Sequence, residues 1–210
     1  VLYLAMDRPR QAARSLRRQL GSAGQDQMAR LAVWKGPPPV DLAKHTSALA
    51  GLAELANADV VVVDSLKDAA LGLTDDEVGA GWNRARQLLL ADGRNLMELH
   101  HIRKAPTGRG PDKAPSIGDI YGSTWITSGA GSVLLLSGDP DDAVVRLHHV
   151  KQPMEEVGPW NVAHHQTEGR LEIVDQVDVA ELVARRGRVT VKDLATVLFD
   201  TPVPNRNQVE

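Results

Sequence analysis

Three predicted strands of this chain end in side chains that can do chemistry: Asp7, the pair Asp64-Ser65 and the pair His100-His101. Ligands of open α/β sheets bind beyond the carboxyl ends of the strands, and a doubly wound sheet brings those ends side by side. A carboxylate there is well placed to hold Mg²⁺, usually through water, beside the phosphates of a nucleotide. A second acid could polarise an attacking water, and a histidine could contact the terminal phosphate. This division of labour is what phosphoryl transfer requires.

Each of these residues also has a purely structural interpretation. Asp64 fits a cap on the turn after its strand, and Asp7 fits the N-cap of a helix whose first turn holds Pro9. The histidines fit polar residues that leave a strand. Zinc bound by histidine is not favoured, because no HExxH or comparable spacing occurs.

The stretch ADVVVVDSLKD, residues 58–68, organises the chain. Its four consecutive valines predict a strand over 59–64 that is buried on both faces, as in the centre of a parallel sheet. The elements predicted around it alternate between strand and helix: strands 1–6, 30–34 and 95–100, and helices 12–20, 45–56 and 77–91. This alternation predicts a parallel α/β core.

After residue 130 the pattern changes to strands in pairs. Strands 131–137 and 144–151 are separated at hairpin spacing, and so are strands 160–165 and 170–174. We therefore predict an antiparallel extension of the α/β core, which together occupy residues 1–175. Residues 176–210 contain two short helical patterns joined by Gly187, which resemble the start of a helix-turn-helix or winged-helix unit.

Composition narrows the class of protein. The 210 residues are 42% hydrophobic, which is enough for one substantial core, and the net charge of −3 gives no global attraction to nucleic acid or membrane. The absence of cysteine excludes disulfides and thiolate chemistry. No apolar run approaches the roughly 20 residues of a membrane helix, so a cytoplasmic protein is expected. Because the chain opens directly in an apolar strand and closes within a helical pattern, we interpret it as a piece of a longer polypeptide.

The segment RKAPTGRGPDKAPSIGDI, residues 103–120, is rich in proline, glycine and basic residues. A loop of this length inside a compact domain is usually functional or disordered. Its cations could contact nucleic-acid phosphates, and the aromatic residues of the predicted short helix 121–128 could stack on bases: Arg103, Lys104, Arg109 and Lys113, with Tyr121 and Trp125. The alternative is a solvated loop with a packed Trp125. The four arginines of the helix between Arg10 and Arg18 could add to such a surface, or form a solvated helix face.

The order of the segments LYLAMD, VVVVDS, LHH and HHVKQP resembles the RecA-like ATPase fold of P-loop ATPases in the AAA family. Within it, the chain is most similar to the hexameric plasmid and phage replicative helicases of the RepA and DnaB kind, over about residues 1–175. The resemblance implies a mostly parallel sheet flanked by helices with antiparallel strands after it, ATP and Mg²⁺ as cofactors, and a hexameric ring that acts on single-stranded DNA.

The resemblance also implies roles for individual residues. Asp7 matches the acid that activates water, where the family more often has glutamate, and Asp64 with Ser65 matches the Walker B aspartate that serves Mg²⁺ and nucleotide. His100 or His101 matches the polar sensor of the next strand. Residues 103–128 match the segment that faces DNA in the channel of the ring.

Two family features differ in this chain. Lys151 matches the lysine that reaches the neighbouring subunit's nucleotide, but Pro153 stands where the family has arginine. No GxxxxGK[ST] phosphate loop occurs in the 210 residues. We therefore expect a helicase motor whose parent chain supplies that loop, while this piece alone binds ATP poorly. The alternatives are a non-catalytic RecA-fold ring or regulatory module, and a clock- or recombinase-type relative with the same fold.

Overall fold

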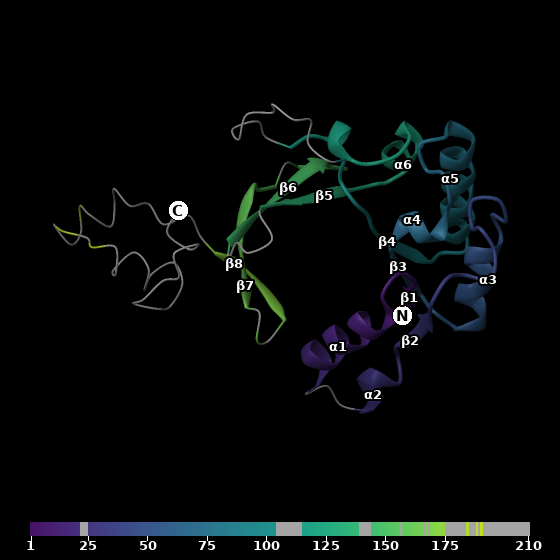
Figure 1. Cartoon of the computed structure of the whole chain (residues 1–210), viewed down its shortest axis with the longest axis horizontal. Helices are drawn as coiled ribbons and strands as arrows, with labels where there is room; N and C mark the ends of the chain where they lie inside the picture. The colour runs from purple at the N-terminus through teal and green to yellow at the C-terminus, as the bar shows by residue number, and fades with distance from the viewer. Residues whose placement is uncertain are drawn as a thin grey trace. The chain divides into compact units, whose positions relative to one another are not determined.

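The computed structural model describes residues 1–21, 25–103, 115–138, 144–155, 157–165 and 169–174, together with positions 167, 184, 188 and 190. The chain divides into two compact units, Val1–Gly131 and Ser132–Glu210. Each unit has its own four-stranded sheet, and we describe each by itself (Figure 1). The predicted boundary between 175 and 176 stays a prediction, since most of the tail lies outside the described residues.

The sheet of the first unit is parallel, with strand order β2-β1-β3-β4. Its strands are β1 (Leu2–Ala5), β2 (Ala32–Lys35), β3 (Val60–Asp64) and β4 (Asn95–Leu99). The valine run forms β3, which pairs in parallel with β1 on one side and β4 on the other. The predicted position of this run inside a parallel sheet is confirmed.

The helices of the first unit lie between and after these strands. They are α1 (Pro9–Leu20), α2 (Gln25–Met28), α3 (Ala48–Leu55), α4 (Leu66–Ala69), α5 (Asp76–Ala91), the 3₁₀ turn η1 (Ile117–Asp119) and α6 (Thr124–Ser128). The carboxylate of Asp75 accepts the backbone N–H of Glu77 at 2.7 Å and so caps the start of α5. The sequence pattern missed α2 and α4, because four residues are too few to display a helical period.

The core lies on one face of the parallel sheet. Side chains alternate between faces along a strand, and the fully buried positions of β1 and β3 are Leu2, Leu4, Val61 and Val63. They pack in one cluster with residues of α3 and α5, among them Leu49, Trp82 and Leu89. On the other face Val60 and Val62 are only partly buried, so the expectation that β3 is buried on both faces was too strong.

The second unit contains an antiparallel sheet in the order β5-β6-β7-β8. Its strands are β5 (Val133–Ser137), β6 (Val144–Lys151), β7 (Trp160–His165) and β8 (Arg170–Val174). Each strand pairs antiparallel with the next, which confirms the two predicted strand pairs and adds the pairing of β6 with β7. In the described part of the chain, no helix has the length and apolar character needed to cross a membrane.

Candidate active site

The strand register of the first unit aligns three residues at the carboxyl edge of the sheet. Ala5 of β1 pairs with Asp64 of β3, and Asp64 pairs with Leu99 of β4. The backbone N–H of Met6 donates to the carbonyl of Asp64 at 2.8 Å, so the alignment continues one residue beyond β1. Asp7 and His100 directly follow Met6 and Leu99. The three strand ends singled out in the sequence therefore meet at one edge.

Asp64 is held by a side chain that the sequence pattern did not identify. The hydroxyl of Tyr3 donates a hydrogen bond to Oδ2 of Asp64 at 2.5 Å, from the neighbouring strand β1. Burial raises the pKa of Tyr3 strongly, and the hydrogen bond and negative charge of Asp64 raise it further. Tyr3 therefore stays a neutral donor and fixes the orientation of the carboxylate.

Asp7 lies in an open and positively charged surrounding. Its Oδ2 is 3.5 Å from Nε of Arg8 and 4.0 Å from Nζ of Lys67, and its side chain is 43% exposed. The predicted helix cap is wrong: α1 begins at Pro9 as expected for proline, but the cap position is Arg8, one residue after Asp7, and it makes no side-chain cap. The carboxylate of Asp7 is therefore available at the edge of the sheet rather than bound to the helix backbone.

Ser65 follows Asp64 and is buried. Its hydroxyl donates to Oδ2 of Asp68 at 2.6 Å, across the first turn of α4. This hydrogen bond engages the proton of the hydroxyl, while the oxygen keeps its capacity to accept.

The two histidines after β4 lie in different surroundings. Nε2 of His100 donates to the carbonyl of Tyr121 at 2.7 Å, and Nδ1 is buried without a partner in the described part of the chain. Desolvation lowers the pKa of His100, and the positive charge of His101 lowers it further, against the smaller opposing effects of the Tyr121 carbonyl and Glu98. His101 is exposed. The neutral ring of His100 is thus tied to Tyr121, whereas the ring of His101 faces solvent.

The segment after the histidines returns to the same edge. Ile102 and Ile120 form an antiparallel bridge, and the N–H of Arg103 donates to the carbonyl of Asp119 at 2.7 Å. The guanidinium of Arg103 donates to the carbonyl of Gly122 at 2.9 Å. The other predicted cations, Lys104, Arg109 and Lys113, lie outside the described residues.

Trp125 and Tyr121 are on the segment that follows the bridge. Trp125 belongs to α6 and is 43% exposed, and Tyr121 is 40% exposed. The alternative of a Trp125 packed into the core is therefore not what the structure has. Both rings present surface on which a base could stack.

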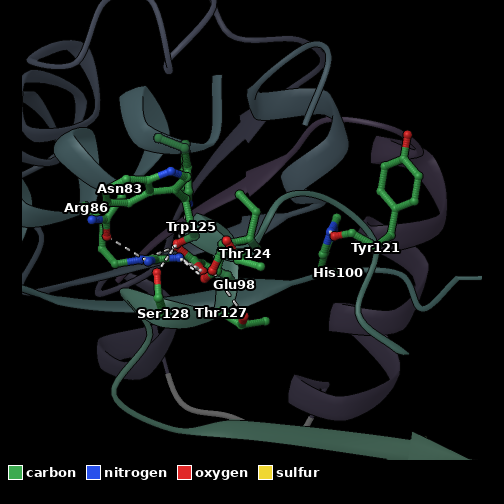
Figure 2. A network of polar contacts seen from close by, with 11 residues as sticks. Asn83, Arg86, Glu98, His100, Tyr121, Thr124, Trp125, Thr127 and Ser128 are labelled. Carbon is green, nitrogen blue, oxygen red and sulfur yellow. Dashed lines mark hydrogen bonds and ion pairs between the residues drawn. The ribbon is translucent and has the colours of Figure 1, made fainter. Parts of the chain in front are cut away.

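A buried ion pair ties α5, β4 and α6 together (Figure 2). The guanidinium of Arg86, 3% exposed, donates to both carboxylate oxygens of Glu98, through Nε at 2.9 Å and Nη2 at 2.8 Å. Nη2 also donates to the carbonyl of Ile126 at 3.0 Å, and Trp82 donates to Glu98 at 2.9 Å. Asn83 accepts from Nη1 at 3.1 Å. Every charged group in this network has a hydrogen-bonding partner, as burial requires.

This network sits two residues before His100 in the same strand. Side chains at positions i and i+2 of a strand share a face, so the alternation of β4 assigns His100 to the face of Glu98 and His101 to that of Asp64. Figure 2 shows His100 beside Tyr121 and apart from the cluster around Arg86. Of the two histidines, His101 therefore has the better position toward Asp64.

Lys151 is the last residue of β6 in the second unit, where it pairs with Val133 of β5. Its predicted role across a subunit boundary is not tested by a single chain.

Sequence reasoning missed Tyr3, Lys67 and the Arg86–Glu98 pair. A single polar ring in the otherwise apolar segment VLYLAM was the available signal for Tyr3. An arginine on the otherwise apolar side of helix 77–91 was the signal for Arg86. Neither partner could be identified, because 61 positions separate Tyr3 from Asp64 and 12 separate Arg86 from Glu98.

The chain is similar in structure to the solved ATPase domain of a DnaB-like helicase, with a TM-score of 0.61 over 83% of this chain and 75% of that one. The two sequences are 13% identical over this match, so the likeness concerns the fold. No protein-family profile matches the chain, and no curated protein matches it in sequence. The expected RecA-like α/β class, with a mostly parallel sheet and later antiparallel strands, is confirmed; the expected helical tail lies outside the described residues.

Proposed function

We propose that this chain is the core of an ATPase motor of the helicase type, which hydrolyses ATP with Mg²⁺ at the carboxyl edge of the parallel sheet and moves on single-stranded DNA. The observation that carries the proposal is the shared row Ala5–Asp64–Leu99, which aligns Asp7, Asp64 and the histidines in a fold similar to an ATPase domain. The registration is what phosphoryl transfer needs, since catalysis there is mostly positioning and charge stabilisation.

The donor set at this edge fits Mg²⁺. Carboxylate oxygens and water are the ligands that this ion prefers, and Asp64 is a partly exposed carboxylate fixed in orientation by Tyr3. In the proposed arrangement Asp64 would hold Mg²⁺ through water, with Ser65 beside the nucleotide. The ion would neutralise charge on the phosphates, and the protein would supply its position.

Asp7 is proposed to orient the attacking water. Its carboxylate is open to solvent and lies 4.0 Å from the ammonium of Lys67, which favours the charged form that a water-polarising group needs. His101 is the better placed of the two histidines to contact the terminal phosphate, while His100 holds Tyr121. Lys151 would act on the nucleotide of a neighbouring subunit in a ring, which is the proposed oligomer.

Single-stranded DNA is the proposed partner of residues 103–128. Arg103 at the base of this segment and the exposed ring of Trp125 supply a phosphate contact and a stacking surface. Lys104, Arg109 and Lys113 would add further phosphate contacts.

The test uses the polypeptide translated from a coding region that begins upstream of Val1, where the proposal requires a GxxxxGK[ST] loop. We expect Mg²⁺-dependent ATP hydrolysis by that protein, and a loss on the order of 100-fold in kcat for Asp64→Asn. The matched control is Asp59→Asn, because Asp59 is an exposed acid at the opposite end of the same valine run. Equal turnover by the Asp64 and Asp59 variants, with circular dichroism showing both folded, would refute the proposal.

A non-catalytic RecA-fold module is the second candidate. It is favoured by the lack of a phosphate loop in these 210 residues, because backbone amides and the lysine of that loop supply most of the grip on a triphosphate. The aspartate at position 7 and Pro153 point the same way. Calorimetry with ATP and Mg²⁺ on the 210-residue chain is expected to detect weak or no binding, and a start codon at Val1 would favour this second candidate.

A further inference from the structure

Helix α1 carries four arginines and no acidic residue: Arg10, Arg14, Arg17 and Arg18. At 100° per residue they fall within a sector of about 100°, and the steps from 10 to 14 and from 14 to 18 are about 6 Å each along the axis. All four side chains are exposed, and no residue of α1 is buried. The helix, drawn in purple in Figure 1, thus presents one continuous positive stripe, which we call the arginine stripe.

The stability of the helix does not account for this arrangement. Arg17 and Arg18 lie in the last turn, where cations interact favourably with the helix dipole, but Arg10 lies in the first turn, where they do not. Arginines spaced three and four apart repel one another by about 0.2–0.5 kcal/mol per pair. A solvated helix usually mixes both signs on its surface. An anionic partner would turn these unfavourable terms into favourable ones.

The chemistry of the stripe fits phosphate groups. All four cations are guanidinium groups, whose planar fork binds phosphate oxygens in pairs, and the chain as a whole is negatively charged, so the attraction is local. A lipid surface fits less well. The opposite side of α1 offers only alanines and two leucines, Leu16 and Leu20, and these are already partly buried.

We infer that α1 is a second nucleic-acid site, in which the arginine stripe binds successive phosphates of a single strand. The inference rests on the proposed function for the identity of the nucleic acid, but needs no ATP. Because α1 starts two residues after Asp7 and connects β1 to the parallel strand β2, it runs away from the candidate active edge. Binding there therefore leaves the nucleotide edge free.

The test measures the fluorescence anisotropy of a labelled oligothymidylate with the 210-residue chain, without nucleotide, over a series of KCl concentrations. We compare the wild type with Arg10→Gln/Arg14→Gln/Arg17→Gln. The matched control, Arg30→Gln/Lys44→Gln/Arg84→Gln, removes three exposed cations elsewhere in the same unit. Loss of three phosphate contacts lowers the slope of log K against log salt by about 2. We expect that change, with at least tenfold weaker binding at low salt, in the stripe variant alone.

Other outcomes overturn the inference. Equal losses in the two triple variants would mean that only net charge matters, and no binding by the wild type would remove the site altogether. Equally tight, stripe-dependent binding to vesicles of phosphatidylserine and phosphatidylcholine would indicate a lipid surface instead. Loss of binding in Arg103→Gln/Trp125→Ala but not in the stripe variant would leave residues 103–128 as the sole site. An inactive ATPase with stripe-dependent DNA binding would refute the proposed catalysis and keep this inference.

Discussion

Tyr3 and Asp64 lie 61 positions apart in the chain and are joined by a hydrogen bond of 2.5 Å between neighbouring strands. The bond links the interior of β1 to the last residue of β3, so the orientation of the candidate magnesium ligand depends on a residue outside the edge itself. Tyr3→Phe removes the donor and little else. We expect a loss of about 1 kcal/mol in unfolding free energy by urea titration. The control is Tyr121→Phe, at an exposed ring, and an equal loss there would contradict the assignment.

The same bond makes a prediction at alkaline pH. Because the folded protein holds the proton of Tyr3 more tightly than the unfolded chain does, its raised pKa stabilises the fold fully below pH 10 and progressively less above it. The chain has two tyrosines, so tyrosinate absorbance separates them. One ring should ionise only at higher pH, and this late phase should be missing in Tyr3→Phe. A Tyr3→Phe protein that keeps the late phase would contradict the prediction.

His100 makes a prediction at acidic pH. Desolvation lowers its pKa below 6.5, so the unfolded chain binds a proton more readily than the folded protein. The contribution of neutral His100 is present above pH 6.5 and is lost as the pH falls below it. We expect the difference in unfolding free energy between wild type and His100→Asn to shrink from pH 7.5 to pH 5. His101→Asn, at the exposed neighbour, should show no such trend, and titration of the imidazole resonances by NMR gives the pKa directly.

The buried pair Arg86–Glu98 is expected to be costly to break. Glu98→Gln leaves the guanidinium of Arg86 without its counter-charge, which costs about 3–5 kcal/mol for a buried pair. Arg86→Met/Glu98→Leu removes both charges and should recover most of that loss. The exposed pair Arg94–Asp92 serves as control, since Asp92→Asn should cost at most about 1 kcal/mol. Thermal unfolding of these variants measures the difference, and equal losses from both single variants would contradict it.

Two glycines test the packing around this pair. A Cβ at Gly129 would collide with Oδ1 of Asn83 and Nη1 of Arg86, so Gly129→Ala should destabilise the fold by about 1–3 kcal/mol. Gly51 lies inside α3 with open space around it, and Gly51→Ala should stabilise by up to about 1 kcal/mol through better helix propensity. Urea unfolding of both variants checks the opposite signs.

The sheet could be predicted because its strands are coded locally. The run of four valines in β3 and the helical periods around it give strand–helix alternation, and alternation implies parallel pairing. The meeting of Asp7, Asp64 and His100 at one edge then follows from topology. The contacts at that edge do not follow, because the partners of Asp64, His100 and Arg86 come from distant parts of the chain, which no local pattern encodes.

Two expectations failed for a definable reason. Asp7 looked like a helix cap because Pro9 follows it, but the cap falls on the residue next to the proline, Arg8. The valine run looked buried on both faces, whereas in this chain only the side toward α3 and α5 is fully covered. In both cases the residue types were interpreted correctly and their exact surroundings were not.

The bridge between Ile102 and Ile120 has a consequence for how such a protein can diversify. The bridge and the adjoining Arg103–Asp119 bond bring the two ends of the intervening stretch together, independently of how many residues it contains. Doubling the length of a closed stretch costs only about 0.6 kcal/mol. Insertions, deletions and wholesale exchanges between these two isoleucines are therefore inexpensive, and the bridge acts as a socket through which the substrate preference could be replaced while the hydrolytic edge stays unchanged.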